Sequence, residues 1–290
     1  MKLAAQSDFF VKNYGPADGL KRVKEIGYNY ASYTVTERYD EPFTTEWTEK
    51  ELKEFFAPVG QSARDNGLEL LYTTVSCDVY NELLPHTFEA RKKMCVHAVK
   101  ACAYMGCKIF ALPTCNFHRN VAGAYETSKA HTFELFDMVK EEADKHGVKL
   151  AVINIPARKS QYCFGCSTED LLELCDKYGA SVVVDPAAAA RSGERLERML
   201  AQIGDKLLHA FIISDYEAAF NMPFMPMMGA MNYPLIIDTL KKLGGDTTVV
   251  MSYTPVFHRY KHFASSTDLN AALGKLLYDM GRGIIGAENA

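Results

Sequence analysis

The chain has 290 residues and carries 32 Lys and Arg against 36 Asp and Glu, a net charge of −4. This slightly acidic balance argues against nucleic acid or an anionic membrane surface as the main partner. Apolar residues make up 48% of the sequence and charged residues 23%, as in ordinary soluble globular proteins. No apolar run approaches the roughly 20 residues that a bilayer-spanning helix needs.

The eight cysteines mostly fall within helix and strand patterns, where they act as small apolar side chains. The first residues, "MKLAAQSDFF", lack the long apolar run and cleavage site of a secretion signal. Both features favour a reducing compartment, so we expect a cytoplasmic protein without structural disulfides.

Apolar runs and helical patterns alternate along the whole chain. The runs with the length of buried strands are 2–7, 28–35, 68–75, 108–114, 148–154, 181–185, 207–214 and 247–253. The stretches with apolar residues at three- and four-residue spacing include 18–27, 89–106, 131–147, 167–179, 194–204 and 233–245. Ser167 and Asp170 have the spacing of a helix capping box. Eight strand–helix units predict one (β/α)8 TIM barrel, a single domain over residues 1–290.

Loop lengths indicate which end of this barrel carries function. The connections from helix to strand are short, whereas several from strand to helix are long, notably 114–125, 155–167, 215–232 and 254–266. Because active sites of such barrels lie where the strands enter these longer loops, we expect the site at the C-terminal ends of the strands. The loop "FNMPFMPMMGAMNY" is rich in methionine, which suits an adaptable apolar pocket, an oligomer contact or simple burial.

Two short motifs suggest other functions. "GRGIIG" at 281–286 matches a dinucleotide-binding pattern, but it follows a helix rather than a strand, so we interpret it as the end of that helix. Cys163 and Cys166 stand two residues apart before a helix, and Cys115 and His118 have the same spacing in the preceding long loop. Together these four residues would make a zinc or redox site, although most such cysteines are structural.

The layout resembles the xylose isomerase-like TIM barrels, which include sugar-phosphate isomerases, relatives of tagatose 3-epimerase and the endonuclease IV branch. The resemblance covers nearly the whole chain and is clearest in "HGVKLAVIN", "VVVD", "LLHAFIISD" and "NYPLIIDTLKKLGG". It implies a divalent metal held by four groups from the last four strands. That metal polarises sugar oxygens while carboxylates move a proton.

This sequence departs from the family's ligand pattern at most positions. Ile153 stands where the strand-five glutamate would be, Ala188 where a histidine would follow strand six, and Ile212 on strand seven. Ser252 replaces the glutamate that ends strand eight. Only Asp185 matches, and one aspartate offers too few oxygens for a hard divalent cation. We therefore expect neither the family's metal nor any other cofactor.

Polar residues remain at the predicted mouth of the barrel. Asp185 and Asp215 are the candidates for acid–base catalysis, although each could instead hold a turn. The substrate-binding candidates are Asn154, Ser252, His118, Arg119, Arg158, Arg191, His258 and Arg259. Because six of these eight side chains are basic or histidine, an anionic sugar derivative is the expected ligand.

These observations lead to two hypotheses for function. The first is a divergent sugar or sugar phosphate isomerase or epimerase that binds a carbohydrate-like ligand without the family's metal. The second is a non-catalytic barrel that binds a ligand or a partner chain. A rebuilt zinc or redox site is a weaker third alternative. The sequence leaves the substrate and the oligomeric state open, a homo-oligomer included.

Overall fold

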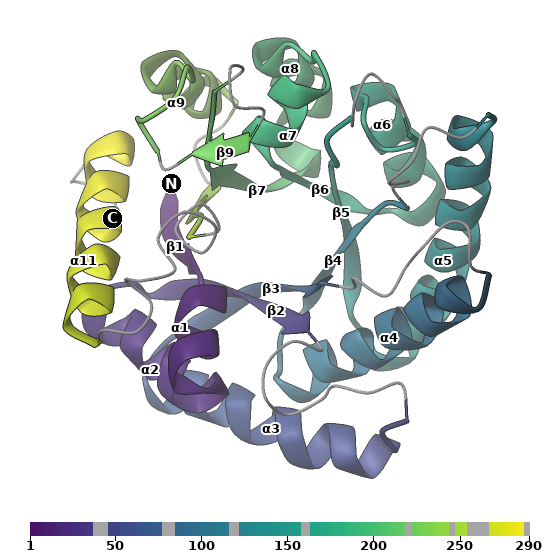
Figure 1. Ribbon diagram of the computed structural model, residues 1–290, viewed down its shortest axis with the longest axis horizontal. Helices are drawn as coiled ribbons and strands as arrows, with labels where there is room; N and C mark the ends of the chain where they lie inside the picture. Colours follow the sequence, from purple (N-terminus) through teal and green to yellow (C-terminus); the bar gives the residue numbers. More distant parts are fainter. Residues whose placement is uncertain are drawn as a thin grey trace.

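The chain forms a closed barrel of parallel strands surrounded by helices (Figure 1). The computed structural model describes residues 1–36, 46–76, 85–115, 122–157, 163–217, 222–224, 226–243, 247–253 and 267–286. The barrel strands are β1 (Lys2–Gln6), β2 (Tyr30–Thr36), β3 (Glu69–Ser76), β4 (Ile109–Pro113), β5 (Lys149–Ile153), β6 (Ser181–Val184), β7 (Leu208–Ile213) and β10 (Thr248–Met251). Their order is β1-β10-β7-β6-β5-β4-β3-β2. The predicted (β/α)8 barrel and all eight predicted strands are confirmed.

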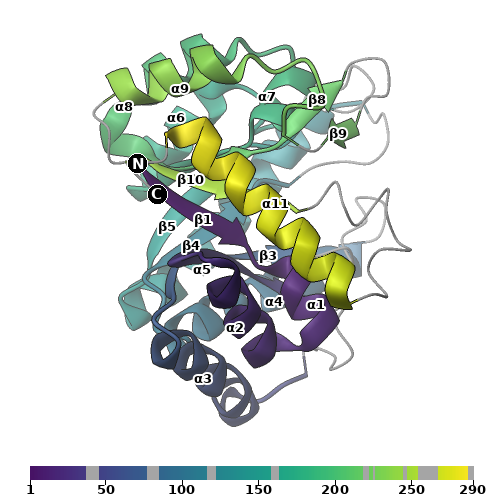
Figure 2. The same cartoon turned by 90° about the vertical axis from the view of Figure 1, so that its left-hand side faces the viewer.

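Helices alternate with these strands and cover the outside of the barrel (Figures 1 and 2). They are α1 (Asp8–Tyr14), α2 (Pro16–Ile26), α3 (Glu49–Asp65), α4 (Pro85–Tyr104), α5 (Ala124–His146), α6 (Thr168–Tyr178), α7 (Pro186–Arg191), α8 (Leu196–Leu207), α9 (Tyr233–Lys242) and α11 (Thr267–Ile285). The motif at 281–286 lies at the end of α11, as its position after a helical pattern predicted. Within the described parts of the chain, no helix combines the length and apolar character needed to cross a membrane.

Small side chains fill the inside of the barrel. The interior cluster is made of Ala4, Ala111, Ala151, Val183, Ala210, Val250 and one large residue, Tyr72. A second and much larger cluster packs the outer faces of the strands against the helices. The strands are thus buried on both faces, which explains why their sequences are nearly continuous apolar runs.

Local sequence signals set the ends of several helices. Ser167 accepts a hydrogen bond from the Asp170 backbone, and the Asp170 side chain accepts one from the Ser167 backbone, so the predicted capping box is present. Helices α5 and α6 end at Gly147 and Gly179, both with φ of 63°, a left-handed conformation that favours glycine. The predicted pattern lacked helix α1, which follows β1 directly, helix α7, and the antiparallel strands β8 (Asp215–Glu217) and β9 (Met222–Phe224).

Two helical glycines provide a test of this packing. A Cβ at Gly60 in α3 would lie 2.1 Å from the Met105 carbonyl oxygen, whereas a Cβ at Gly283 in α11 would meet nothing within 4 Å. We expect Gly60→Ala to lower the free energy of unfolding by about 1–3 kcal/mol through overpacking. Gly283→Ala should raise it by about 0.5–1 kcal/mol because alanine favours the helix. Denaturant unfolding of both variants measures the difference, and equal effects would contradict the tight approach of α3 to Met105.

Candidate functional site

Asp185 lies directly after β6 and caps the N-terminus of α7. Its Oδ1 accepts hydrogen bonds from the backbone N–H groups of Ala187 (2.9 Å) and Ala188 (3.4 Å) and from the Ser214 hydroxyl (3.0 Å). These donors confirm that Asp185 holds the turn at Pro186. The side chain is nevertheless only half-buried. Burial raises the pKa of Asp185 above its ordinary value, and this effect exceeds the opposing one of the donors.

Asn154 fixes the backbone of Asp185 from the end of the neighbouring strand β5. Its side-chain amide donates to the Asp185 carbonyl oxygen (2.9 Å), and its Oδ1 accepts from the Asp185 backbone N–H (2.6 Å). Asn154 is 2% exposed. Asn154 was predicted to contact substrate. In the structure, both polar atoms of its side chain instead bond the Asp185 backbone and position that residue.

Asp8 is a second carboxylate at the same end of the barrel, and the sequence analysis did not single it out. It follows β1, begins α1, and is half-buried. Its Oδ2 accepts from the Gln6 amide (2.9 Å), and Gln6 in turn accepts from the hydroxyl of Ser252 (2.9 Å), which lies just after β10. Burial raises the pKa of Asp8, although the neighbouring Thr34 and Gln6 side chains oppose the change.

The Oδ1 atom of Asp8 is buried and has no hydrogen-bond partner among the described residues. A buried carboxylate oxygen without a donor is costly, so a hydroxyl group placed against it would gain a strong hydrogen bond. Ser252, predicted as a substrate contact, is 4% exposed. Its hydroxyl donates to Gln6, which in turn donates to Asp8, so Ser252 positions Asp8 indirectly.

Tyr72 lies inside the barrel, and the charges of both carboxylates affect its pKa. It extends from β3 into the interior cluster and is 2% exposed. Burial raises the pKa of its phenol well above the ordinary value, and the charges of Asp8 and Asp185 raise it further. The hydroxyl therefore stays protonated and lies within electrostatic reach of both acids. We refer to Asp8, Tyr72 and Asp185 as the mouth cluster.

Asp215, the second predicted catalytic acid, has a different environment. It is fully buried, and its Oδ1 accepts from the backbone N–H groups of Tyr216 (2.8 Å) and Met231 (3.0 Å). A Cβ at Gly229 would lie 2.4 Å from the same oxygen, so the turn packs directly on the carboxylate. These contacts fit the structural alternative, in which Asp215 holds the turn that leads to α9.

Among the predicted basic contacts, Arg191 is the one within the described residues. It ends α7, is half-buried, and its charge lowers the pKa of Asp185 in opposition to burial. An arginine beside the mouth cluster suits an anionic group on a ligand. The other predicted basic contacts lie outside the described residues, namely His118, Arg119, Arg158, His258 and Arg259.

The side chains at the expected metal positions do not fit a divalent cation. Ile153 and Ile212 pack against the interior cluster, and Ala188 is 3% exposed. The Ser252 hydroxyl already donates to Gln6. Among the described residues, no three His, Cys, Asp or Glu side chains come together as a metal site would require.

The cysteines of the proposed zinc or redox site are buried. Cys115, Cys163 and Cys166 are each 1% exposed or less. Burial raises the pKa of Cys115, and it raises that of Cys166 to about 11. Since the thiolate is the form that binds metal or reacts, these thiols fit a packing role; His118 lies outside the described residues.

The sequence model of the xylose isomerase-like TIM barrel matches residues 20–262, which is most of the chain. The chain belongs to this family. A comparison with curated proteins gives no match. Family membership accounts for the barrel architecture.

Solved structures of the family are similar over almost the whole chain. D-psicose 3-epimerase with D-tagatose from Clostridium cellulolyticum H10 has a TM-score of 0.71 at 11% identity, covering 98% of this chain and 99% of that one. The 3-keto-D-glucoside 4-epimerase YcjR from E. coli has 0.70 at 14%, covering 98% and 99%. The IolI protein with a bound zinc atom has 0.70 at 15%, covering 99% of each. At these identities the likeness establishes the fold of sugar epimerases.

The raised pKa of Asp185 can be tested with Asp185→Asn, which keeps an acceptor for the helix cap. A carboxyl whose folded pKa is raised stabilises the protein below its unfolded value of 3.8 and loses that contribution as the pH rises through the folded value. As the pH rises from 3.8 to the folded pKa, the free energy of unfolding of the variant should therefore increase relative to that of the wild type. The total increase is about 1.4 kcal/mol for each unit by which folding raises the pKa, and the difference stays constant at higher pH.

Denaturant unfolding at a series of pH values measures this difference. Asp176→Asn, at an exposed position on α6, makes the same charge change in solvent and is the matched control. A difference between Asp185→Asn and wild type that does not change with pH would contradict a raised pKa.

Proposed function

We propose that this protein binds a carbohydrate-type, anionic ligand at the C-terminal end of its barrel without the family's divalent metal, and acts as a divergent sugar or sugar phosphate isomerase or epimerase. The mouth cluster is the observation that carries the proposal. It combines two half-buried acids, which follow strands β1 and β6 three places apart in the barrel, with a protonated phenol that is within electrostatic reach of both. The fold shared with sugar epimerases supports the substrate class.

The cluster has the groups that proton transfer beside a carbonyl requires. One carboxylate removes the proton from the carbon next to the sugar carbonyl, and the other acid returns a proton to that carbon from the opposite side. Burial raises the pKa of both acids toward neutral pH. Each acid can therefore more readily give up and take up a proton during the reaction. The Tyr72 hydroxyl donates a hydrogen bond to the oxygen on which negative charge develops, a task that the metal performs elsewhere in the family.

Arg191 and Asp8 determine how the ligand is held in this proposal. The guanidinium group binds the phosphate or carboxylate of the sugar derivative, and the unpartnered Oδ1 of Asp8 accepts a sugar hydroxyl. Asn154 and Ser252 act indirectly, by positioning Asp185 and Gln6.

A non-catalytic ligand-binding barrel is the second candidate, and the geometry of Asp185 favours it. Three donors converge on its Oδ1, so this oxygen is fully used in holding α7 to the barrel. If that is its whole task, the protein binds the same ligand class but transfers no proton.

The metal-free part of the proposal predicts a low metal content. Protein purified without chelator should contain well below one Mn, Mg or Zn per chain by elemental analysis, because the side chains at 153, 188 and 212 offer no ligands. The IolI protein, whose structure holds zinc, is the control when purified in the same way. One tightly bound divalent ion per chain would contradict the proposal.

The catalytic part predicts exchange of a substrate proton with solvent. A thermal-shift screen of ketoses, sugar phosphates and sugar acids, with and without EDTA, identifies the ligand. Incubation of that ligand in D2O should then introduce deuterium beside its carbonyl. We expect Asp185→Asn and Asp8→Asn to slow the exchange by about 10²–10⁴-fold while the folded protein still binds.

Asp176→Asn should leave both binding and exchange unchanged. Binding without exchange in the wild type would favour the non-catalytic barrel over the enzyme. Absence of any ligand in the screen, or a stabilising effect that EDTA abolishes, would overturn the proposal of metal-free sugar binding.

A further inference from the structure

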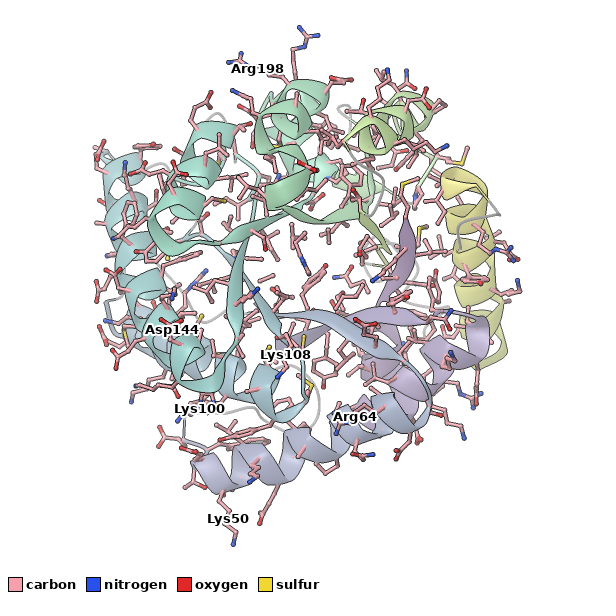
Figure 3. All side chains as sticks on the ribbon, turned by 180° about the vertical axis from the view of Figure 1, so that it is seen from behind. Lys50, Arg64, Lys100, Lys108, Asp144 and Arg198 are labelled. Atoms are coloured by element: carbon pink, nitrogen blue, oxygen red, sulfur yellow. The ribbon has the colours of Figure 1, made fainter. Side chains whose placement is uncertain are left out.

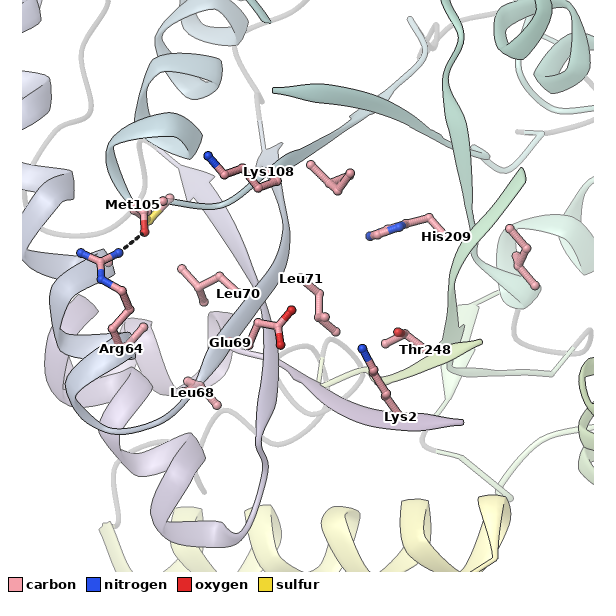
Figure 4. A pocket seen from close by; sticks show the side chains of 15 residues that line it. Lys2, Arg64, Leu68, Glu69, Leu70, Leu71, Met105, Lys108, His209 and Thr248 are labelled. Atoms are coloured by element: carbon pink, nitrogen blue, oxygen red, sulfur yellow. Dashed lines mark hydrogen bonds between the residues drawn. The ribbon is translucent and has the colours of Figure 1, made fainter. Parts of the chain in front are cut away.

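A hollow of about 490 Å³ lies at the opposite end of the barrel, where the strands begin. Figures 3 and 4 show this end and its lining from behind. The lining includes the first residues of four strands, Lys2, Glu69, Leu208 and Thr248. Residues at the ends of α3 and α4 complete it on one side. The volume is within the range of pockets that take small metabolites.

The charge around this N-terminal hollow is mainly positive. Lys2, Arg64 and Lys108 line it against one carboxylate, Glu69. The Arg64 guanidinium is held by the Met105 carbonyl oxygen at 3.0 Å. Within the described part of the chain, no carboxylate lies within ion-pair distance of either lysine, although this protein is acidic as a whole. Three positive side chains against one carboxylate give the hollow a net positive charge, which favours an anionic ligand.

The position of Lys2 is fixed by an aromatic ring rather than by an acid. Its Nζ lies 5.1 Å from the centroid of the Tyr30 ring on the adjacent strand β2. In Figure 4 the Lys2 amine points into the hollow between Glu69 and Thr248. The cation–π contact therefore orients the ammonium group and leaves its N–H donors available to a ligand.

His209 extends from β7 into the same hollow (Figure 4). Its Nε2 is buried and has no hydrogen-bond partner among the described residues. Burial lowers the pKa of the ring, although the Leu71 backbone favours the protonated form. A buried ring nitrogen without a partner is costly, and an oxyanion against Nε2 would give the protonated ring an acceptor.

We propose that the N-terminal hollow binds the phosphate group of a small phosphorylated metabolite between Lys2 and His209, with the Thr248 hydroxyl as a further donor. The remaining volume, beside Leu71 and Ile109, holds the rest of the molecule. This site does not depend on the proposed sugar chemistry, because its lining residues lie at the N-terminal ends of the strands, whereas Asp8 and Asp185 follow the C-terminal ends. Tyr72 lies between the two sites.

Binding at this site is coupled to protonation of His209. The charged and titratable groups that face the ring are Lys2 on β1, Glu69 and Tyr72 on β3, and Lys108 before β4; the Tyr72 ring is 6.0 Å from it. An oxyanion favours the imidazolium, so affinity should fall as the pH rises, by up to about tenfold per pH unit where one proton is taken up.

Sulfate is the first probe, because its charge stays constant from pH 5 to 8, and inorganic phosphate is the second. The measurement is the shift of the His209 ring proton in NMR spectra at constant ionic strength, with the signal assigned from its absence in His209→Gln. A specific site gives a saturating shift, whereas the general effect of sulfate on protein surfaces does not saturate.

Two rim variants and one control make the test specific. Lys2→Gln should weaken sulfate binding at least tenfold, and Glu69→Gln should strengthen it severalfold by removing the one opposing charge. Lys53→Gln, at an exposed position on α3 outside the hollow, makes the same charge change as Lys2→Gln and should have no effect. Because Lys2 and Glu69 are at the rim, these variants remain informative if His209→Gln fails to fold.

A saturating shift that weakens in Lys2→Gln and with rising pH supports the proposal. A shift that does not saturate, or that is the same in Lys2→Gln as in Lys53→Gln, overturns it. If phosphate binds only at the C-terminal end, the His209 signal stays constant while signals of Asp8 and Asp185 move, and the proposal is again wrong.

Discussion

Closure of the barrel between its first and last strands is the constraint on which both proposed sites depend. Strand β1 pairs in parallel with β10, and the register joins Lys2 to Thr248 at one end and Ala5 to Met251 at the other. The next residues along each strand, Gln6 and Ser252, then come within hydrogen-bond distance. A shift of one residue in this register would turn inward-facing side chains outward. The seam therefore places Asp8 at the mouth and Lys2 in the N-terminal hollow through one set of backbone hydrogen bonds.

Asp185 has an observed capping contact and a proposed catalytic task, and the physical requirements of the two oppose each other. As the cap of α7, Asp185 benefits from its negative charge because three donors point at one oxygen. As a group for proton transfer, it benefits from the burial that raises its pKa. Burial is the larger effect here, and Asn154 holds the backbone so that the carboxylate keeps its position in either protonation state.

The apolar interior limits what can stabilise charge in the barrel. Isoleucines at 153 and 212 make the interior drier, which raises the cost of any bare charge. A neutral hydrogen-bond donor suits such surroundings better than a cation with too few ligands, and Tyr72 is kept neutral by burial and by the nearby acids. The same ring contacts His209 from the other side, so one aromatic residue borders both ends of the barrel interior.

The sequence by itself determined the barrel, its eight strands and the capping box at Ser167, because apolar runs, helical spacing and capping are local signals. It also predicted Asp185 as a candidate acid and, through the family resemblance, the positions at which metal ligands are replaced. Only the tertiary structure decided that Asp215 is enclosed by its own turn and that Asp8 and Asp185 both act electrostatically on Tyr72. The reason is physical, because barrel closure and strand register decide which acids lie near one another. They bring together residues more than 170 positions apart in the chain, and a local sequence pattern carries no information about such pairs.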